Sequence, residues 1–217
     1  MRTAVALVLM AWPAAVWAGN VTGRVSVVDK GGKPATDPQE TVVWIDDVKL
    51  KPKPSRATIT MRGKAFVPRV TVIGAGGTVD FPNEDPILHN VFSVSGENRF
   101  DLDLYKRPKS GSWTFSQAGL VRVYCNIHPQ MSAVVMVRDN PFFTKAGADG
   151  AFVLEGVPAG KHVLKAWHER GGESSTEVVV PAGDGQVSAE LQLDASKFKR
   201  AAHKKKDGTD YGSGESY

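Results

Sequence analysis

The residues best suited to metal chemistry lie in one short segment, in which Cys125, His128 and Met131 follow one another at intervals of three residues. This C-x2-H-x2-M spacing allows one loop between two strands to direct a thiolate, an imidazole and a thioether at a single ion. A short loop can also contain these residues by chance, because a free cysteine is usually a small buried hydrophobic residue. The segment alone is therefore a weak indication of a metal site.

A histidine upstream of this segment strengthens the indication. His89 stands at the start of a predicted strand, although a lone histidine in such a position is more often structural or solvated. Two histidines, one cysteine and one methionine form the ligand set of a trigonal copper site with a weak axial thioether, and soft sulfur ligands favour copper over hard cations. A closed zinc site would more often show paired cysteines. We therefore predict one copper ion, bound by His89, Cys125, His128 and Met131.

The elements that must position these residues are short strands. Runs rich in Val, Ile, Thr and aromatic residues alternate with Gly, Pro, Asn and Asp, and no window has a helical period. Many short strands separated by turn residues are typical of sandwiches and barrels, so we predict an all-β protein. The predicted strands cover residues 21–28, 41–45, 67–73, 78–81, 91–94, 113–115, 120–124, 133–137, 151–154, 162–168, 175–180 and 187–193.

The N-terminal segment 1–18 has the pattern of a signal peptide. Arg2 gives a short positive region, an apolar run follows, and Ala18 supplies a small residue at the cleavage position. We expect cleavage after Ala18 and export to the periplasm, with an uncleaved anchor as the alternative. The run is too short for a membrane span, and no later stretch is apolar enough to cross a bilayer. An exported chain with Cys125 as its single cysteine cannot use disulfides as a scaffold.

The basic residues of the chain give little indication of a partner. Most of the formal net charge of +4 lies in the C-terminal stretch 195–217, which is polar and lacks periodicity, so we predict a disordered basic tail. Such a tail could dock on an acidic partner or a membrane surface, and a solvated tail is the simpler interpretation. Nucleic-acid binding is not indicated, because the basic residues form a tail and not a patch with interleaved aromatic residues.

Between residues 55 and 139 the chain resembles the cupredoxins, in particular plastocyanin- and amicyanin-like members. The resemblance includes Phe66-Val67-Pro68, the strand 77–81, Gly119 and the segment 125–131 with its proline after His128, while Ile127 departs from the proline of many small cupredoxins. It implies a Greek-key β-sandwich with a type 1 copper site. It further implies that Asn90 steadies the Cys125 sulfur, and that His128 is the electron portal, framed by the apolar residues Ile127, Pro129 and Pro86.

Two further segments resemble the opening and the middle of a carboxypeptidase-regulatory-like domain, a small transthyretin-like β-sandwich. They are Gly23-Arg24-Val25 with the following residues up to Ile45, and Asp149-Gly150-Ala151-Phe152 with Val157-Pro158-Ala159-Gly160. Since every predicted ligand lies between them, we predict a cupredoxin domain (51–139) inserted between two parts of a regulatory-like sandwich (19–50 and 140–194). A plain tandem of an N-terminal strand pair and a metal domain is the alternative.

These features predict a monomeric, exported copper protein that carries single electrons between redox protein partners of unknown identity. Two alternatives stay open. The chain could bind and deliver copper to another exported protein, or its sandwich could bind a partner while copper only stabilises the fold. We predict no enzyme activity, because there is no nucleophile elbow, phosphate-binding loop or His-x-His pair, and the 5 histidines leave too few for a catalytic copper centre.

Overall fold

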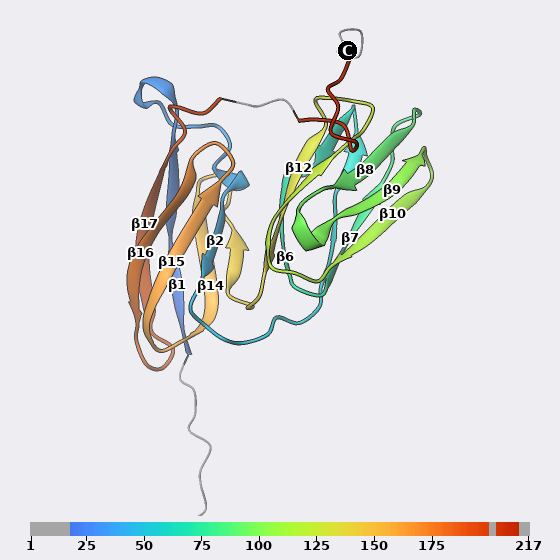
Figure 1. The fold of residues 1–217 in the computed structure, drawn as a ribbon. Coiled ribbons are helices and arrows are strands. Elements are labelled where there is room, and N and C mark those ends of the chain that lie inside the picture. Colours follow the sequence, from blue (N-terminus) through green and yellow to red (C-terminus); the bar gives the residue numbers. More distant parts are fainter. Residues whose placement is uncertain (1–17, 200–202, 213–217) are drawn as a thin grey trace, which may run out of the picture.

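The computed structural model describes residues 18–199 and 203–212, and in these residues the chain folds into strands joined by loops and three short 3₁₀ helices. The helices are Lys30–Gly32, Pro38–Glu40 and Gly96–Asn98. Figure 1 shows that the strands form two lobes side by side. The all-β sandwich class predicted from the sequence is therefore confirmed. No helix among the described residues has the length and apolarity of a membrane span. The predicted signal peptide lies outside the described residues, apart from Ala18, with which the first strand begins.

The first lobe, called here the flanking sandwich, combines strands from both ends of the chain. Its strands are β1 (Ala18–Val28), β2 (Val42–Ile45), β13 (Phe143–Lys145), β14 (Ala151–Pro158), β15 (Gly160–His168), β16 (Gly172–Val180) and β17 (Gln186–Asp194). One sheet has the order β14-β1-β17 and the other the order β13-β2-β15-β16. β1 and β17 run parallel, so the first and the last strand of this lobe are neighbours in one sheet.

The second lobe, called here the central sandwich, is formed by the middle of the chain. Its strands are β3 (Arg56–Thr58), β4 (Thr60–Arg62), β5 (Ala65–Val67), β6 (Val70–Gly74), β7 (Gly77–Pro82), β8 (His89–Ser93), β9 (Phe100–Tyr105), β10 (Ser110–Phe115), β11 (Gly119–Tyr124) and β12 (Ser132–Arg138). A sheet of order β10-β7-β3 faces a sheet of order β6-β12-β11-β8-β9, beside the hairpin β4-β5. Cys125 and Met131 belong to the hydrophobic core between these sheets.

The sequence pattern of a strand reflects how many of its faces are buried. β7 alternates: Val79 and Phe81 point into the core, and Asp80 between them is partly exposed. β12 instead is buried along its interior on both faces, which explains its unbroken apolar run. Its residues Ala133, Val135 and Val137 fill the core of the central sandwich. Its residues Val134 and Met136 belong to a second cluster.

That second cluster is the interface between the sandwiches. Val134 and Met136 of β12, with Val70 of β6, pack against Val42 and Trp44 of β2. β2 therefore resembles β12 in being buried on both faces, since its other residues lie in the core of the flanking sandwich. The two sandwiches thus stack through the broad faces of their sheets, as Figure 1 shows for β2, β6 and β12.

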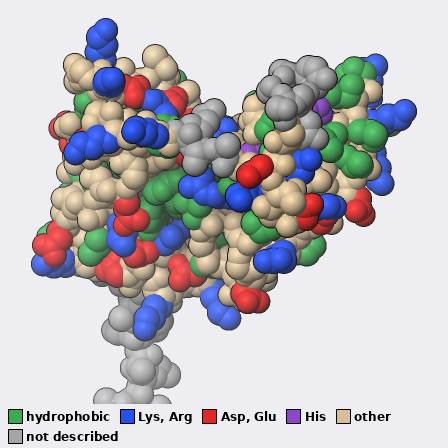
Figure 2. Space-filling model, turned by 45° about the horizontal axis from the view of Figure 1, so that its top comes forward, with side chains coloured by type: hydrophobic (Ala, Val, Ile, Leu, Met, Phe, Trp, Pro, Cys, Tyr) green, Lys and Arg blue, Asp and Glu red, His purple; other side chains and the backbone are tan. Residues whose placement is uncertain are grey.

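Polar contacts complete the interface at the outer edge of β6. Val70 donates its N–H to Glu40 Oε2 (2.9 Å), and its carbonyl accepts a hydrogen bond from Lys145 Nζ (2.7 Å). Arg69 forms a bidentate pair with Glu169, at 2.6 and 2.8 Å. Figure 2 shows Lys and Arg side chains gathered where the two lobes meet. Each of these contacts joins a residue of the central sandwich to one of the flanking sandwich.

The Arg69–Glu169 pair leads to a prediction about stability. Only 12% of the Glu169 side chain and 26% of the Arg69 side chain are exposed, so removing the arginine leaves a poorly solvated carboxylate. We expect Arg69→Met to lower the free energy of unfolding by about 2 kcal/mol in chemical denaturation. Arg62→Met is the matched control, because Arg62 pairs with Glu84 at the exposed surface, where ion pairs contribute little. Equal effects of the two substitutions would contradict this description of the interface.

Candidate metal centre

The segment that holds most of the predicted ligands is the loop between β11 and β12, residues 125–131, called here the ligand loop. Two backbone hydrogen bonds close it: Cys125 N–H donates to the Met131 carbonyl (3.2 Å), and Met131 N–H donates to the His128 carbonyl (3.0 Å). His89 is the first residue of β8, which pairs with β11 in the same sheet. Neighbouring strands of one sheet therefore position all four predicted ligands.

Three of these four side chains converge at the end of the central sandwich. His89 Nδ1 lies 3.0 Å from His128 Nδ1, and Cys125 Sγ lies 3.6 Å from the same nitrogen. The three potential ligand atoms all lie within 4.8 Å of one another. His89 and Cys125 are fully buried, and His128 is partly exposed. Two imidazole nitrogens and a sulfur in this arrangement fit a thiophilic transition-metal ion, and the donor set points to copper.

Asp85, which no sequence motif indicates, orients His89. His89 Nε2 lies 2.8 Å from Asp85 Oδ2, so the carboxylate holds the proton on Nε2 and leaves Nδ1 free to bind a metal. Burial acts to raise the pKa of Asp85, but hydrogen bonds from the backbone of Lys64 and Gly63 and from His89 outweigh it, and the pKa is lowered. Asp85 is therefore ionised at neutral pH. Such a carboxylate raises the basicity of a histidine ligand.

The turn between β4 and β5 holds Asp85 in place. Gly63 N–H donates to Asp85 Oδ1 (2.8 Å), and Lys64 N–H donates to Asp85 Oδ2 (2.9 Å). Both turn residues have positive φ, 62° for Gly63 and 56° for Lys64, as in the tight turns that join hairpin strands. A strained non-glycine residue thus contributes to the support of His89.

The buried surroundings of Cys125 favour its protonated thiol. Burial raises the pKa of the Cys125 thiol, and backbone N–H groups of Asn90, Ile127 and His128 donate to the sulfur and partly offset this. The pKa remains raised, so the thiol holds its proton until a metal ion replaces it. Binding of a metal at this sulfur should therefore release a proton.

His128 is held in its neutral form. Burial lowers its pKa, and electrostatic interactions with His89 and Lys64 lower it further. Neutral imidazole is the form that binds a metal. His128 is also the most accessible of the three converging side chains, and its neighbour Ile127 is 36% exposed.

Asn90 contacts Cys125 through its backbone, and its side chain turns towards β9. Asn90 Nδ2 donates to Asp101 Oδ1 (2.7 Å) and to the Asp103 carbonyl (3.0 Å). Asp101 and Asp103, which look in the sequence like solvent-facing residues, thereby fix Asn90 across a register shift between β8 and β9. The contact of Asn90 with the sulfur is thus made by its N–H group, and its role in a metal site stays a prediction.

Met131 is fully buried at the end of the ligand loop, in the same core as Cys125. Its backbone closes the loop as described above. Its role as a ligand stays a prediction.

The described part of the C-terminal stretch differs from the disordered tail predicted from the sequence. Residues 203–212 lie on the ligand loop: Tyr211 hydroxyl donates to the Cys125 carbonyl (2.6 Å), and Lys206 N–H donates to Asn126 Oδ1 (2.8 Å). The prediction of a disordered tail is therefore wrong for this part. It rested on composition, and these contacts depend on a partner surface distant in the sequence.

The remaining histidines have other partners. His162 Nε2 lies 2.8 Å from the Pro158 carbonyl and its Nδ1 lies 3.2 Å from Asp47. His168 lies 3.6 Å from Asp37 in the flanking sandwich. His203 stacks on Tyr124, with ring centroids 4.3 Å apart. Among the described residues, the metal-type cluster contains His89 and His128 but none of these three.

No protein-family model and no curated protein matches the sequence. Similar solved structures include a purple cupredoxin from Nitrosopumilus maritimus, at 22% identity and a TM-score of 0.34 over 37% of this chain and 98% of that chain. An oxidized variant of amicyanin has 25% identity and a TM-score of 0.36, over 38% of this chain and 81% of that chain.

A third similar structure corrects one prediction. A copper-containing nitrite reductase from Thermus scotoductus is 25% identical, with a TM-score of 0.36, over 52% of this chain and 28% of that chain. That similar structure is an enzyme, so the prediction that this chain has no enzyme activity is wrong as an exclusion. The similarity does not show that this chain is itself an enzyme.

Proposed function

We propose that the chain is a type 1 (blue) copper protein that carries single electrons, with one ion held by His89, Cys125, His128 and Met131. The observation that most supports this proposal is the convergence of two imidazole nitrogens and one sulfur within 4.8 Å. Copper bound there would supply a one-electron couple between its cupric and cuprous forms. The side chains that hold it are fixed by packed strands and by hydrogen bonds, which favours a constant geometry during transfer.

The residues around such a centre would have different roles. His89 and Cys125 are buried and keep water away from the donor atoms. Asp85 and the N–H groups around the sulfur hold their orientation. The partly exposed His128 is the proposed route for the electron, because exposed apolar side chains, Ile127 and Leu88, are next to two of the ligands in the sequence. Its partners would be redox proteins that dock on this apolar end.

One spectrum and one voltammogram test the proposal. The full chain loaded with one equivalent of copper is expected to show intense visible absorption from thiolate-to-copper charge transfer, and a reversible one-electron wave. Rapid transfer of the metal to a chelator or to an acceptor protein, without a reversible wave, would favour copper delivery instead. A chain that takes up no copper would contradict both functions.

Export and the scaffold role of the flanking sandwich belong to the same proposal. A periplasmic carrier would have lost residues 1–18, so N-terminal sequencing of the isolated protein should begin at Gly19. Retention of Met1 would contradict cleavage. We further propose that the flanking sandwich is the regulatory-like scaffold into which the copper domain is inserted, which the return of the chain to it at β13 supports.

A further inference from the structure

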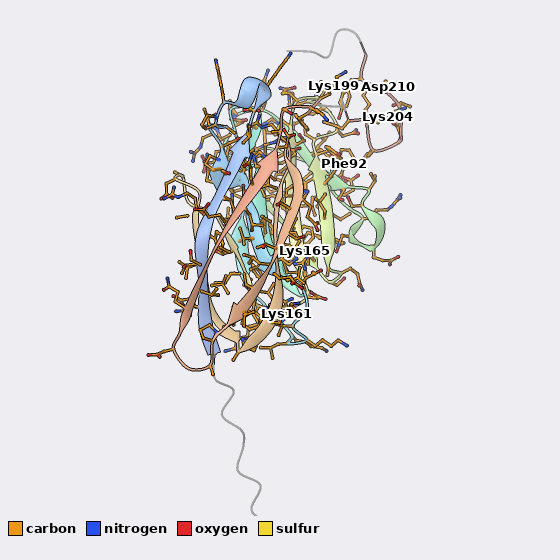
Figure 3. The ribbon with its side chains drawn as sticks, turned by 90° about the vertical axis from the view of Figure 1, so that its left-hand side faces the viewer. Phe92, Lys161, Lys165, Lys199, Lys204 and Asp210 are labelled. Carbon is orange, nitrogen blue, oxygen red and sulfur yellow. The ribbon has the colours of Figure 1, made fainter. Side chains whose placement is uncertain are left out.

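Residues 203–212, called here the C-terminal strap, lie across the candidate metal centre. β17 belongs to the flanking sandwich, and residues 203–212, further along the chain, lie at the end of the central sandwich where the ligand loop stands (Figure 1). Figure 3 shows Lys204 and Asp210 at this same end of the molecule, beyond Phe92 of β8. The strap, which follows β17 in the chain, therefore lies at the ligand-loop end of the central sandwich.

The strap holds the backbone and side chains of the ligand loop directly. Tyr211 hydroxyl donates to the carbonyl of Cys125 itself, at 2.6 Å. Lys206 N–H donates to the side-chain oxygen of Asn126, the next residue, at 2.8 Å. Two points of the loop at and beside the sulfur ligand are thus fixed by the strap.

A third contact joins the strap to β9, which is linked to the sulfur through Asn90. Lys206 Nζ pairs with Asp101 Oδ2 at 2.5 Å. The other oxygen of Asp101 accepts from Asn90 Nδ2 at 2.7 Å, and the N–H of Asn90 donates to Cys125. Lys206 therefore acts on the thiol through Asp101 and Asn90, in addition to its contact with Asn126.

Aromatic packing joins the strap to the residue before the ligand loop. The His203 ring stacks on Tyr124, the residue before Cys125, with an interplanar angle of 23°. The Tyr211 ring meets His203 edge-on, with centroids 5.2 Å apart. These rings form a continuous series from Tyr124, next to the ligand loop, to Tyr211 of the strap.

The strap has internal structure that prepares it for these contacts. Lys205 N–H donates to the Thr209 carbonyl and Gly208 N–H donates to the Lys205 carbonyl, each at 2.9 Å. Gly208 has a positive φ of 84°, and Asp207 accepts from the N–H of Thr209 at 2.9 Å. This compact turn brings Lys206 and Tyr211 to the loop together, which lowers the entropy cost of docking.

We propose that the C-terminal strap is part of the metal centre, with Tyr211 and Lys206 as positioning residues that hold the ligand loop closed and slow the release of copper. The inference rests on the proposed function, since it assumes that the loop binds copper. Release requires Cys125 and His128 to move apart, and the strap opposes that movement at the Cys125 carbonyl and at Asn126. Its hydrogen bonds thus lengthen the time for which the ion stays bound.

The test uses the full chain loaded with cuprous copper and a competing chelator. Tyr211→Phe removes one hydroxyl and keeps the ring, so we expect copper release about fivefold faster, the effect of one hydrogen bond of ordinary strength. We expect a larger acceleration for the double variant Tyr211→Phe with Lys206→Gln, and a shift in reduction potential. Lys204→Gln is the matched control in the same strap, because the Lys204 side chain is 63% exposed.

The outcomes separate this inference from the proposed function. A full chain that takes up no copper defeats the proposed function. The variants of Tyr211 and Lys206 could instead release copper at the rate of the unaltered chain and have the same reduction potential. This result would contradict the proposed role of the strap and leave the proposed function intact. Faster release in these variants and an unchanged rate for Lys204→Gln support it.

Discussion

Replacement of Cys125 by serine is expected to abolish the visible absorption of the copper-loaded chain. The band would arise from charge transfer between the Cys125 thiolate and copper, and a serine oxygen is a harder ligand without a comparable transition. Cys125 is buried and receives hydrogen bonds from three backbone N–H groups. The other sulfur of the ligand loop belongs to Met131, a thioether, which cannot replace the thiolate in this transition. Absorption spectroscopy during a copper titration measures the effect.

Met131→Leu is the matched control for this prediction. A leucine of similar volume keeps the core packed, so the variant should retain the thiolate band and change the reduction potential, because an axial thioether tunes the metal without supplying the colour. Full colour in the Cys125→Ser variant would show that the assignment of the sulfur ligand is wrong. Loss of colour in Met131→Leu would assign Met131 a larger role than the one proposed.

Asp85→Asn is expected to weaken copper binding by about 10- to 100-fold, the usual cost of losing the partner of a histidine ligand. Three donors, Gly63 N–H, Lys64 N–H and His89 Nε2, point at the two oxygens of Asp85. An amide has only one acceptor oxygen, and its NH₂ group would face a donor. His89 would then lose its fixed orientation. Competition with a chelator of known affinity measures the loss.

The neighbouring carboxylate provides the control. Glu84, the residue before Asp85, pairs with Arg62 at 2.6 Å on the exposed surface. Glu84→Gln should therefore leave the copper affinity unchanged. If both substitutions weakened binding equally, the effect would reflect the charge of the surface and not the Asp85–His89 hydrogen bond.

Spacing in the sequence accounts for much of the candidate centre. A cysteine and a histidine three residues apart on one loop are constrained by the hairpin β11–β12 to lie close together, and His89 begins the adjoining strand. Asp85 could not be predicted in this way. A carboxylate in a loop before a strand is ordinary turn chemistry, and its role depends on the Gly63-Lys64 turn, which comes from another part of the chain.

The C-terminal strap shows a different limit of sequence reasoning. Composition predicts whether a segment can form its own core, and residues 203–212 cannot. Their order comes from contacts with a surface formed elsewhere, such as the one between Tyr211 and Cys125. The interface between the sandwiches did leave a signal: the unbroken apolar runs in β2 and β12 indicate burial on both faces.

The outer edge of β6 has a consequence for how the molecule can be divided. A central sandwich cut free would expose the N–H and carbonyl of Val70 that Glu40 and Lys145 now occupy, beside an apolar surface formed by Val134 and Met136. Open strand edges and contiguous apolar surfaces promote self-association. The flanking sandwich therefore covers surfaces through which the central sandwich would otherwise aggregate. The central sandwich is for the same reason unsuited to exist alone as a small diffusible carrier.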